Sequence, residues 1–131
     1  MTTTPHQILV AEDNPVTSNV LKFNLQRGGF IVHVSNNGQE ALNFLNRQVV
    51  DLIITDFQMP RMSGLELIQK IRESQTFGQT PIFLCSAKGL ELDLDMFHGD
   101  YHVQQVFFKP FSPKAIVEAA NQLFDRESAS A

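Results

Sequence analysis

Short apolar runs recur along the chain and have the length of buried β-strands. Four of them extend over Gln7 to Ala11, Val49 to Thr55, Pro81 to Cys85 and Val106 to Phe108. These runs are almost continuously apolar, which is typical of strands covered on both faces of a parallel sheet. Phe30 to Ser35 alternates apolar and polar residues instead, so we expect this strand at an edge of the sheet.

A first helix is predicted directly after the first strand. Asn14-Pro15 supplies a favourable N-cap followed by proline at the first helical position. An apolar stripe follows, made of Val16, Val20 and Phe23. Gly28-Gly29 predicts the end of this helix.

Four further helical segments are expected between or after the remaining strands. Three have clear apolar periodicity and are predicted over about Gln39 to Arg47, after Gly64, and from Ser112-Pro113 onward. The segment between the fourth and fifth strands, somewhere in Gly89 to Phe97, is poorly patterned. The alternation of strands and helices predicts a three-layer α/β fold, in which helices cover both faces of a mainly parallel five-stranded sheet.

Length and composition narrow the class of protein. The chain has 131 residues, of which 43% are hydrophobic and 18% charged. We therefore expect one globular domain over residues 1–131, with its core over about 7–125 and short flexible tails. We expect no output domain. The net charge of -4 and the lack of clustered Lys and Arg argue against a nucleic-acid partner. No signal peptide and no membrane-spanning run is visible, which favours a cytoplasmic protein without a membrane partner. Cys85, the one cysteine, follows an apolar run and is expected to be a packed, inert thiol.

Polar residues follow four of the predicted strands directly. Strand one is followed by Glu12-Asp13, strand three by Asp56, strand four by Ser86 and strand five by Lys109. Open α/β sheets bind their ligands at the carboxyl ends of the strands. We therefore expect these side chains to converge on one edge of the sheet.

This set of groups predicts a particular chemistry. Three clustered carboxylates repel one another unless a cation is present, and an all-oxygen cluster suits Mg²⁺, or Mn²⁺ in its place. Lys109 adds a counter-charge, and Ser86 offers a hydrogen bond to a phosphoryl oxygen. The arrangement suits phosphoryl transfer, in which an aspartate can act as the covalent nucleophile.

Several separated motifs resemble the response-regulator receiver family of two-component signalling, of the chemotaxis-regulator kind. They are Ile8 to Asn14, Asp51 to Pro60, Met59 to Gly64, Ser86-Ala87 and Lys109 to Phe111, and they occur in the order found in the family. The resemblance covers about residues 7 to 125. It implies a doubly wound (βα)5 fold with the flavodoxin-like strand order 2-1-3-4-5.

The resemblance also assigns roles to residues of this sequence. It implies that Asp56 is the phosphoacceptor, that Asp13 is a direct metal ligand and that Glu12 acts through metal-bound water. The backbone carbonyl of Gln58 would complete the protein ligands. Ser86 and Lys109 would hold the phosphoryl oxygens, Ala87 would leave them room, and Lys109-Pro110 matches a peptide that is frequently cis in the family.

The implied function is that of a phosphorelay switch. A partner histidine kinase or histidine phosphotransfer protein would donate the phosphoryl group, and a changed surface would then be presented to a downstream protein. Such a domain is not an enzyme in the usual sense, although it catalyses its own phosphorylation and dephosphorylation.

One position departs from the family pattern. The family often has an aromatic residue on strand five whose ring swings inward on phosphorylation, and the corresponding residue here is Val106. A β-branched side chain has a stiff χ1 and cannot sweep the same volume. We therefore expect the response to pass through the Ser86 loop and the fourth helical segment, with Gly89 as a hinge.

Three other functions compete with this interpretation. A phosphorylation-independent docking module of the same fold is favoured by Val106 and disfavoured by the complete acidic set and Lys109. A flavodoxin-like FMN carrier would need a phosphate-binding loop after strand one, which the sequence lacks. An enzyme for a small diffusible substrate is disfavoured because no His or Cys joins the predicted site.

Overall fold

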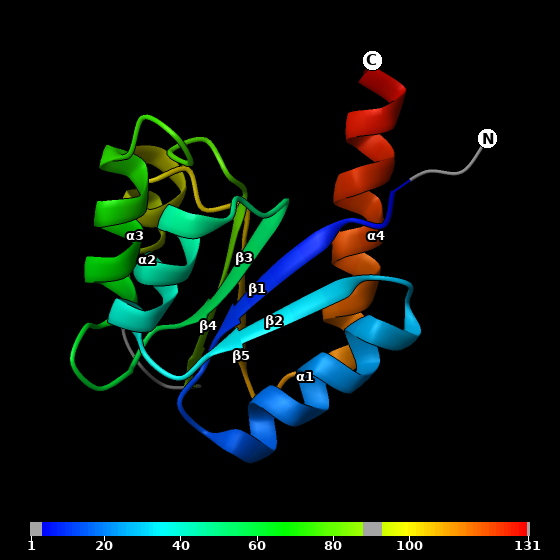
Figure 1. Ribbon diagram of the computed structural model, residues 1–131, viewed down its shortest axis with the longest axis horizontal. Helices are drawn as coiled ribbons and strands as arrows, with labels where there is room; N and C mark the ends of the chain where they lie inside the picture. Colours follow the sequence, from blue (N-terminus) through cyan, green and yellow to red (C-terminus); the bar gives the residue numbers. More distant parts are fainter. Residues whose placement is uncertain (1–3, 88–92, 131) are drawn as a thin grey trace.

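The structure is a computed structural model that describes residues 4–87 and 93–130, with the side chains described up to residue 125. A single parallel sheet lies at its centre, with helices on both faces (Figure 1). The strands are β1 (Gln7–Ala11), β2 (Ile31–Ser35), β3 (Leu52–Asp56), β4 (Ile82–Ala87) and β5 (Gln105–Lys109). Their order is β2-β1-β3-β4-β5, which confirms the predicted order and the edge position of β2.

The helices are α1 (Pro15–Arg27), α2 (Gly38–Arg47), α3 (Gly64–Glu73) and α4 (Pro113–Ser130). Side chains cap the first three helices at their N-termini. Asn and Ser are favoured at this position because their side-chain oxygens accept hydrogen bonds from backbone N–H groups of the first turn. Oδ1 of Asn14 accepts from Val16 N at 2.9 Å, Oδ1 of Asn37 accepts from Glu40 N at 2.9 Å, and Oγ of Ser63 accepts from Glu66 N at 3.2 Å. In the described part of the chain, no helix is long and apolar enough to cross a membrane.

The two faces of the sheet carry separate apolar layers. α1 and α4 pack on one face, where the layer includes Leu21 and Ile116, and α2 and α3 pack on the other, where it includes Leu45 and Ile68 (Figure 1). β1 and β3 lie in the middle, and their apolar side chains are buried on both faces. This double burial explains why their sequences are continuously apolar.

The apolar stripe predicted on α1 does not pack on the sheet. Val16 is 71% exposed, and Val20 and Phe23 are exposed as well. The face that packs on the sheet carries Ser18, Leu21 and Leu25 instead. The helix is thus apolar on both sides, and its outer side is available to another molecule.

Three other boundaries differ from the sequence prediction. The third strand was predicted to begin at Val49, but β3 begins at Leu52, and Val49 lies exposed in the loop before it. α4 continues to Ser130, beyond the predicted end of the core at residue 125. Between β4 and β5 the structure has a π-helix over Met96–Asp100, while the predicted hinge at Gly89 lies outside the described residues.

Gly64 fixes the path of the chain after β3. Its N–H donates to the Phe57 carbonyl at 2.8 Å. A Cβ at this position would lie 2.8 Å from Cα of Phe57 and would also overlap the carbonyl of Asp56. Only glycine therefore lets α3 start this close to the end of β3.

Candidate functional site

Three carboxylates meet at the carboxyl ends of β1 and β3. Glu12 and Asp13 directly follow β1, Asp56 is the last residue of β3, and the two strands pair with Ala11 opposite Thr55. One carboxylate oxygen from each acidic residue lies within 4.8 Å of the others. Glu12 and Asp56 are buried, with 3% and 7% exposure, whereas Asp13 is exposed to solvent. Parallel topology thus brings Asp56 to two acids that lie 44 and 43 residues before it, as the sequence predicts.

Lys109 reaches this acidic cluster from the end of β5. Its Nζ lies 3.0 Å from Oε1 of Glu12 and 2.9 Å from Oδ1 of Asp56. The Lys109 side chain is 30% exposed, so the ammonium sits between buried acids and solvent. The Lys109-Pro110 peptide is cis, as the family resemblance implies. One cation therefore bridges two of the three carboxylates.

Burial and mutual repulsion oppose ionisation of these acids. Burial is the largest effect on both buried carboxyls, and it raises the pKa of Asp56 above 3.8 and that of Glu12 above 4.5. Hydrogen bonds from Lys109 act in the opposite direction on both. Burial lowers the pKa of Lys109, but its bonds to Asp56 and Glu12 outweigh burial, and the pKa is raised above 10.5.

Ser86 lies at the end of β4 and is fully buried. Its Oγ is the one buried side-chain oxygen or nitrogen among the described residues that has no hydrogen-bond partner. Buried hydroxyl groups normally have a partner, and an orphaned one calls for an explanation. A phosphoryl oxygen or a water molecule held at the strand ends would satisfy it.

Two further predicted residues flank the site. Ala87 is the last residue of β4, pairs with Lys109 and is exposed, so it places no bulk over the strand end. Gln58 lies in the loop two residues after Asp56, and the role of its carbonyl as a ligand stays a prediction. Cys85 pairs with Asp56 across β3 and β4. Burial raises the pKa of the Cys85 thiol to about 12, so this thiol is no nucleophile.

The residues present fit a hard divalent cation. Three carboxylates supply only oxygen ligands, and Asp13 leaves the cluster open to solvent, which suits an ion that keeps several waters. The ammonium of Lys109 meets Glu12 and Asp56, while no ion pair is formed by Asp13 within the described residues. A cation near Asp13 would thus relieve the repulsion that Lys109 does not reach.

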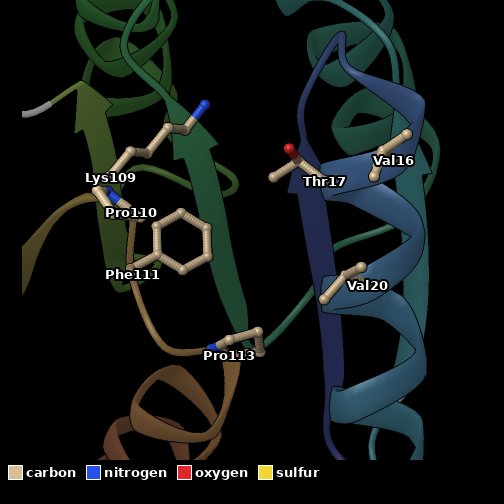
Figure 2. Close-up of a pocket in the computed structure, with 7 residues that line it drawn as sticks. All are labelled: Val16, Thr17, Val20, Lys109, Pro110, Phe111 and Pro113. Atoms are coloured by element: carbon tan, nitrogen blue, oxygen red, sulfur yellow. The ribbon is translucent and has the colours of Figure 1, made fainter.

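An apolar groove that was not predicted from the sequence lies beside the site (Figure 2). It has a volume of about 250 Å³ and is lined by Val16, Thr17, Val20, Lys109, Pro110, Phe111 and Pro113. Figure 2 shows that the Phe111 ring lies between the loop after β5 and α1. The sequence signal for this groove is the apolar stripe on α1, because Val16 and Val20 belong to that stripe and line the groove.

Comparison with known proteins gives one consistent result. The sequence model for the response regulator receiver domain matches residues 8–121. The chain is 34% identical over 125 residues to the transcriptional regulatory protein SrrA of Staphylococcus aureus, with 92% of this chain and 48% of that protein covered. It is 34% identical over 124 residues to the hybrid signal transduction histidine kinase I of Dictyostelium discoideum, with 89% and 7% covered. The chain thus spans about half or less of these curated relatives.

The fold is also found among solved structures. The structure of the chemotaxis protein CheY4 of Vibrio cholerae is similar to this one with a TM-score of 0.82. The two chains share 23% identity, and the similarity covers 91% of this chain and 98% of CheY4. At this level of identity, the likeness concerns the fold.

Proposed function

This chain belongs to the response regulator receiver domain family, which works in phosphorelay signalling, and we propose that Asp56 is its phosphoacceptor. The observation that carries the proposal is the position of the Asp56 carboxylate, between Lys109 at 2.9 Å and the acidic residues Glu12 and Asp13. A nucleophilic carboxylate beside a cation and an open acidic site suits phosphoryl transfer, which depends mostly on positioning and charge neutralisation.

The transfer step uses residues of this chain as follows. An oxygen of the Asp56 carboxylate attacks the phosphorus, while the P–N bond of a phosphohistidine breaks and its electron pair stays on the imidazole. With acetyl phosphate the P–O bond breaks and acetate leaves. Lys109 then pairs with the new phosphoryl charge, and the Ser86 hydroxyl donates to a phosphoryl oxygen. The chain in this way assists its own phosphorylation. In the later hydrolysis, a water molecule attacks the phosphorus, the P–O bond to Asp56 breaks, and inorganic phosphate leaves the regenerated carboxylate.

Mg²⁺ or Mn²⁺ is the cofactor that fits the site. Asp13 and Asp56 would hold it directly, Glu12 would act through bound water, and the carbonyl of Gln58 would complete the protein ligands. When bound, the ion supplies positive charge to the phosphoryl oxygens. Ala87 keeps the strand end open for the phosphoryl group.

We assign the apolar groove beside Lys109 to the phosphodonor, a histidine kinase or a histidine phosphotransfer protein. A donor must touch the molecule at the edge where Asp56 lies, and Lys109 lines both the groove and the site. Exposed apolar side chains that cluster in this way mark protein contacts. Val16→Ser is expected to slow transfer from a phosphohistidine donor and to leave uptake from acetyl phosphate unchanged.

The alternative of phosphorylation-independent docking is not favoured. It does not explain why three carboxylates and Lys109 assemble at one edge, where burial and repulsion act against their ionisation. We propose that residues 1–131 act as one receiver unit that presents a changed surface to a downstream protein.

Intact-mass measurement tests the proposal. Wild-type protein incubated with acetyl phosphate and Mg²⁺ should gain the mass of one phosphoryl group, and Asp56→Asn should gain none. Asp125→Asn is the matched control, because Asp125 is exposed and follows Phe124, whose ring stacks on His6 before the start of β1, at the end of the sheet opposite the site. Equal uptake by Asp56→Asn and Asp125→Asn would show that the phosphoacceptor has been misassigned.

A further inference from the structure

Three aromatic rings connect the end of β3 with the segment before β5. Phe57 directly follows Asp56, and its ring meets the Phe97 ring edge-on, with 6.0 Å between the centroids and 82° between the planes. The Phe97 ring in turn lies 6.5 Å from the Tyr101 ring, at 51°. Offset and edge-to-face pairs of this kind are the arrangements that aromatic rings prefer. Phe97 is 1% exposed, so it is closely packed, and an inward movement of either neighbouring ring would press on it.

The backbone of Phe57 is fixed to the core beside the phosphoacceptor. Its N–H donates to the Cys85 carbonyl at 2.7 Å, and its carbonyl accepts from Gly64 N at 2.8 Å. These two bonds tie the Phe57 backbone to β4 and to the start of α3. The half-buried ring of Phe57 is the part that is able to respond.

The far end of the aromatic path is attached to α3. The Tyr101 hydroxyl accepts from Nε2 of Gln69 at 2.8 Å, and the Tyr101 carbonyl accepts from Nε of Arg72 at 2.6 Å. Tyr101 is half-buried and packs against the apolar layer, so this residue lies partly at the surface. A displacement of Phe97 would change the Tyr101 hydroxyl and the surface beside Gln69.

The segment that carries Phe97 has unusual geometry. Phe97 lies in the π-helix Met96–Asp100, a form that is rare and frequently occurs at functional sites. Val106 packs against the same apolar layer as Phe57 and Tyr101. The stiff valine offers no ring that could rotate, whereas Phe57, Phe97 and Tyr101 bring three rings to this layer.

We propose that Phe57, Phe97 and Tyr101 act as a coupled aromatic switch, which carries the change at Asp56 to the surface formed by Tyr101 and Gln69. This inference rests on the proposed function, because it needs a phosphoryl group at Asp56. It replaces the strand-five ring that the family often uses with rings from the loop after β3, from the π-helix and from Tyr101, which follows the π-helix.

The single tyrosine of the chain provides a spectroscopic probe of this switch. Tyr101 is the single tyrosine, and the sequence contains no tryptophan. Protein labelled with 3-fluorotyrosine therefore gives one ¹⁹F protein resonance. Beryllofluoride with Mg²⁺, which imitates the aspartyl phosphate, gives separate ¹⁹F signals when bound. One spectrum thus reports both the occupancy of the site and the response of Tyr101.

In wild-type protein, the Tyr101 resonance should shift as the signals of bound beryllofluoride appear. Phe97→Leu removes both ring contacts and keeps an apolar side chain, so the Tyr101 shift should be lost while beryllofluoride still binds. Phe83→Leu is the matched control, because Phe83 is 2% exposed and lies in the apolar layer on the other face of the sheet. This control should keep the shift.

Several results would overturn the proposal. A Tyr101 shift in Phe97→Leu equal to that of wild type would show that the path is not used, as would a wild-type resonance that stays unshifted with beryllofluoride bound. If Phe97→Leu fails to fold, Phe57→Leu at the half-buried end of the path must lose the shift instead. Absence of bound beryllofluoride in wild-type protein would refute the proposed function together with the switch.

Discussion

Replacement of Lys109 by methionine should destabilise the metal-free protein, because it removes the cation between two buried acids. The ammonium lies 3.0 Å from Glu12 and 2.9 Å from Asp56. Methionine keeps much of the apolar stem and removes only the charge. In the variant, the carboxyl groups of Glu12 and Asp56 would stay buried and would still repel each other, but the ammonium group that offsets these two effects would be gone.

The size of the loss follows from the geometry. At an effective dielectric constant of about 20, each of the two attractions is roughly 5–6 kcal/mol before hydration is considered. Removing one partner of a buried pair costs about 3–5 kcal/mol. The Lys109 side chain is 30% exposed, so water already screens the pair and the carboxyls of the variant can take up protons. We therefore expect a loss of about 2 kcal/mol near neutral pH.

The loss should depend on pH in a defined direction. Burial raises the pKa of Asp56 above 3.8 and that of Glu12 above 4.5, and the hydrogen bonds from Lys109 hold both pKa values down. Without Lys109 both values rise further. A carboxyl with a raised folded pKa stabilises the fold in its protonated form, and this contribution is lost as the pH rises through the folded pKa. The loss in free energy of unfolding, relative to wild type, is called the deficit of the variant. This deficit should thus be small below pH 3.8 and grow as the pH rises through the pKa values of the two carboxyls in the folded variant.

Urea unfolding monitored by circular dichroism, with chelator present, measures this deficit across the pH range. Lys114→Met is the matched control, since Lys114 is exposed and forms no ion pair within the described part of the chain. Added Mg²⁺ should reduce the deficit, because a second cation then relieves the acids. Equal stability of Lys109→Met and wild type near neutral pH, or a deficit that does not change with pH, would refute the reasoning.

Three further predictions concern other groups. Asp13→Ala should weaken Mg²⁺ binding by about tenfold or more in titration calorimetry, whereas Asp125→Ala should not, and equal affinities would remove Asp13 from the ligand set. Ser86→Ala should raise the free energy of unfolding without phosphate by about 1 kcal/mol, because it removes a buried hydroxyl that has no partner. The same variant should take up phosphate more slowly in mass time courses, and unchanged rates would exclude the hydroxyl from the site. Arg72→Lys should lower the free energy of unfolding by about 2 kcal/mol, because lysine cannot reach the four carbonyls that accept from Arg72. The control is Lys70→Met, at an exposed residue of the same helix. A loss in Arg72→Lys no greater than that of the control would contradict the prediction.

Much of the fold could be predicted because burial on both faces leaves a simple pattern. β1 coincides with the predicted Gln7 to Ala11, and the cap at Asn14 is formed as expected. The outward direction of the α1 stripe could not be predicted. Leu21 and Leu25 form a second apolar set on the same helix, and periodicity alone does not tell which set meets the sheet.

The site was predictable to the extent that topology determines it. In a parallel sheet, residues after successive strands meet at one edge, so Glu12, Asp56 and Lys109 converge whatever their distance in sequence. The double contact of Lys109 depends on side-chain conformation, which the sequence does not show. The same holds for the ring contacts of Phe97, because a π-helix has no periodic apolar signal in five residues.

The central claim, that Asp56 carries the phosphoryl group, is tested most directly by chemical mapping. Protein phosphorylated with acetyl phosphate and Mg²⁺ is reduced with borohydride, which converts an aspartyl phosphate to homoserine, and its peptides are then sequenced by mass spectrometry. We expect homoserine in place of Asp56 and unmodified aspartate at every other position. Homoserine in place of Asp13 or Asp51, with Asp56 unchanged, would contradict it.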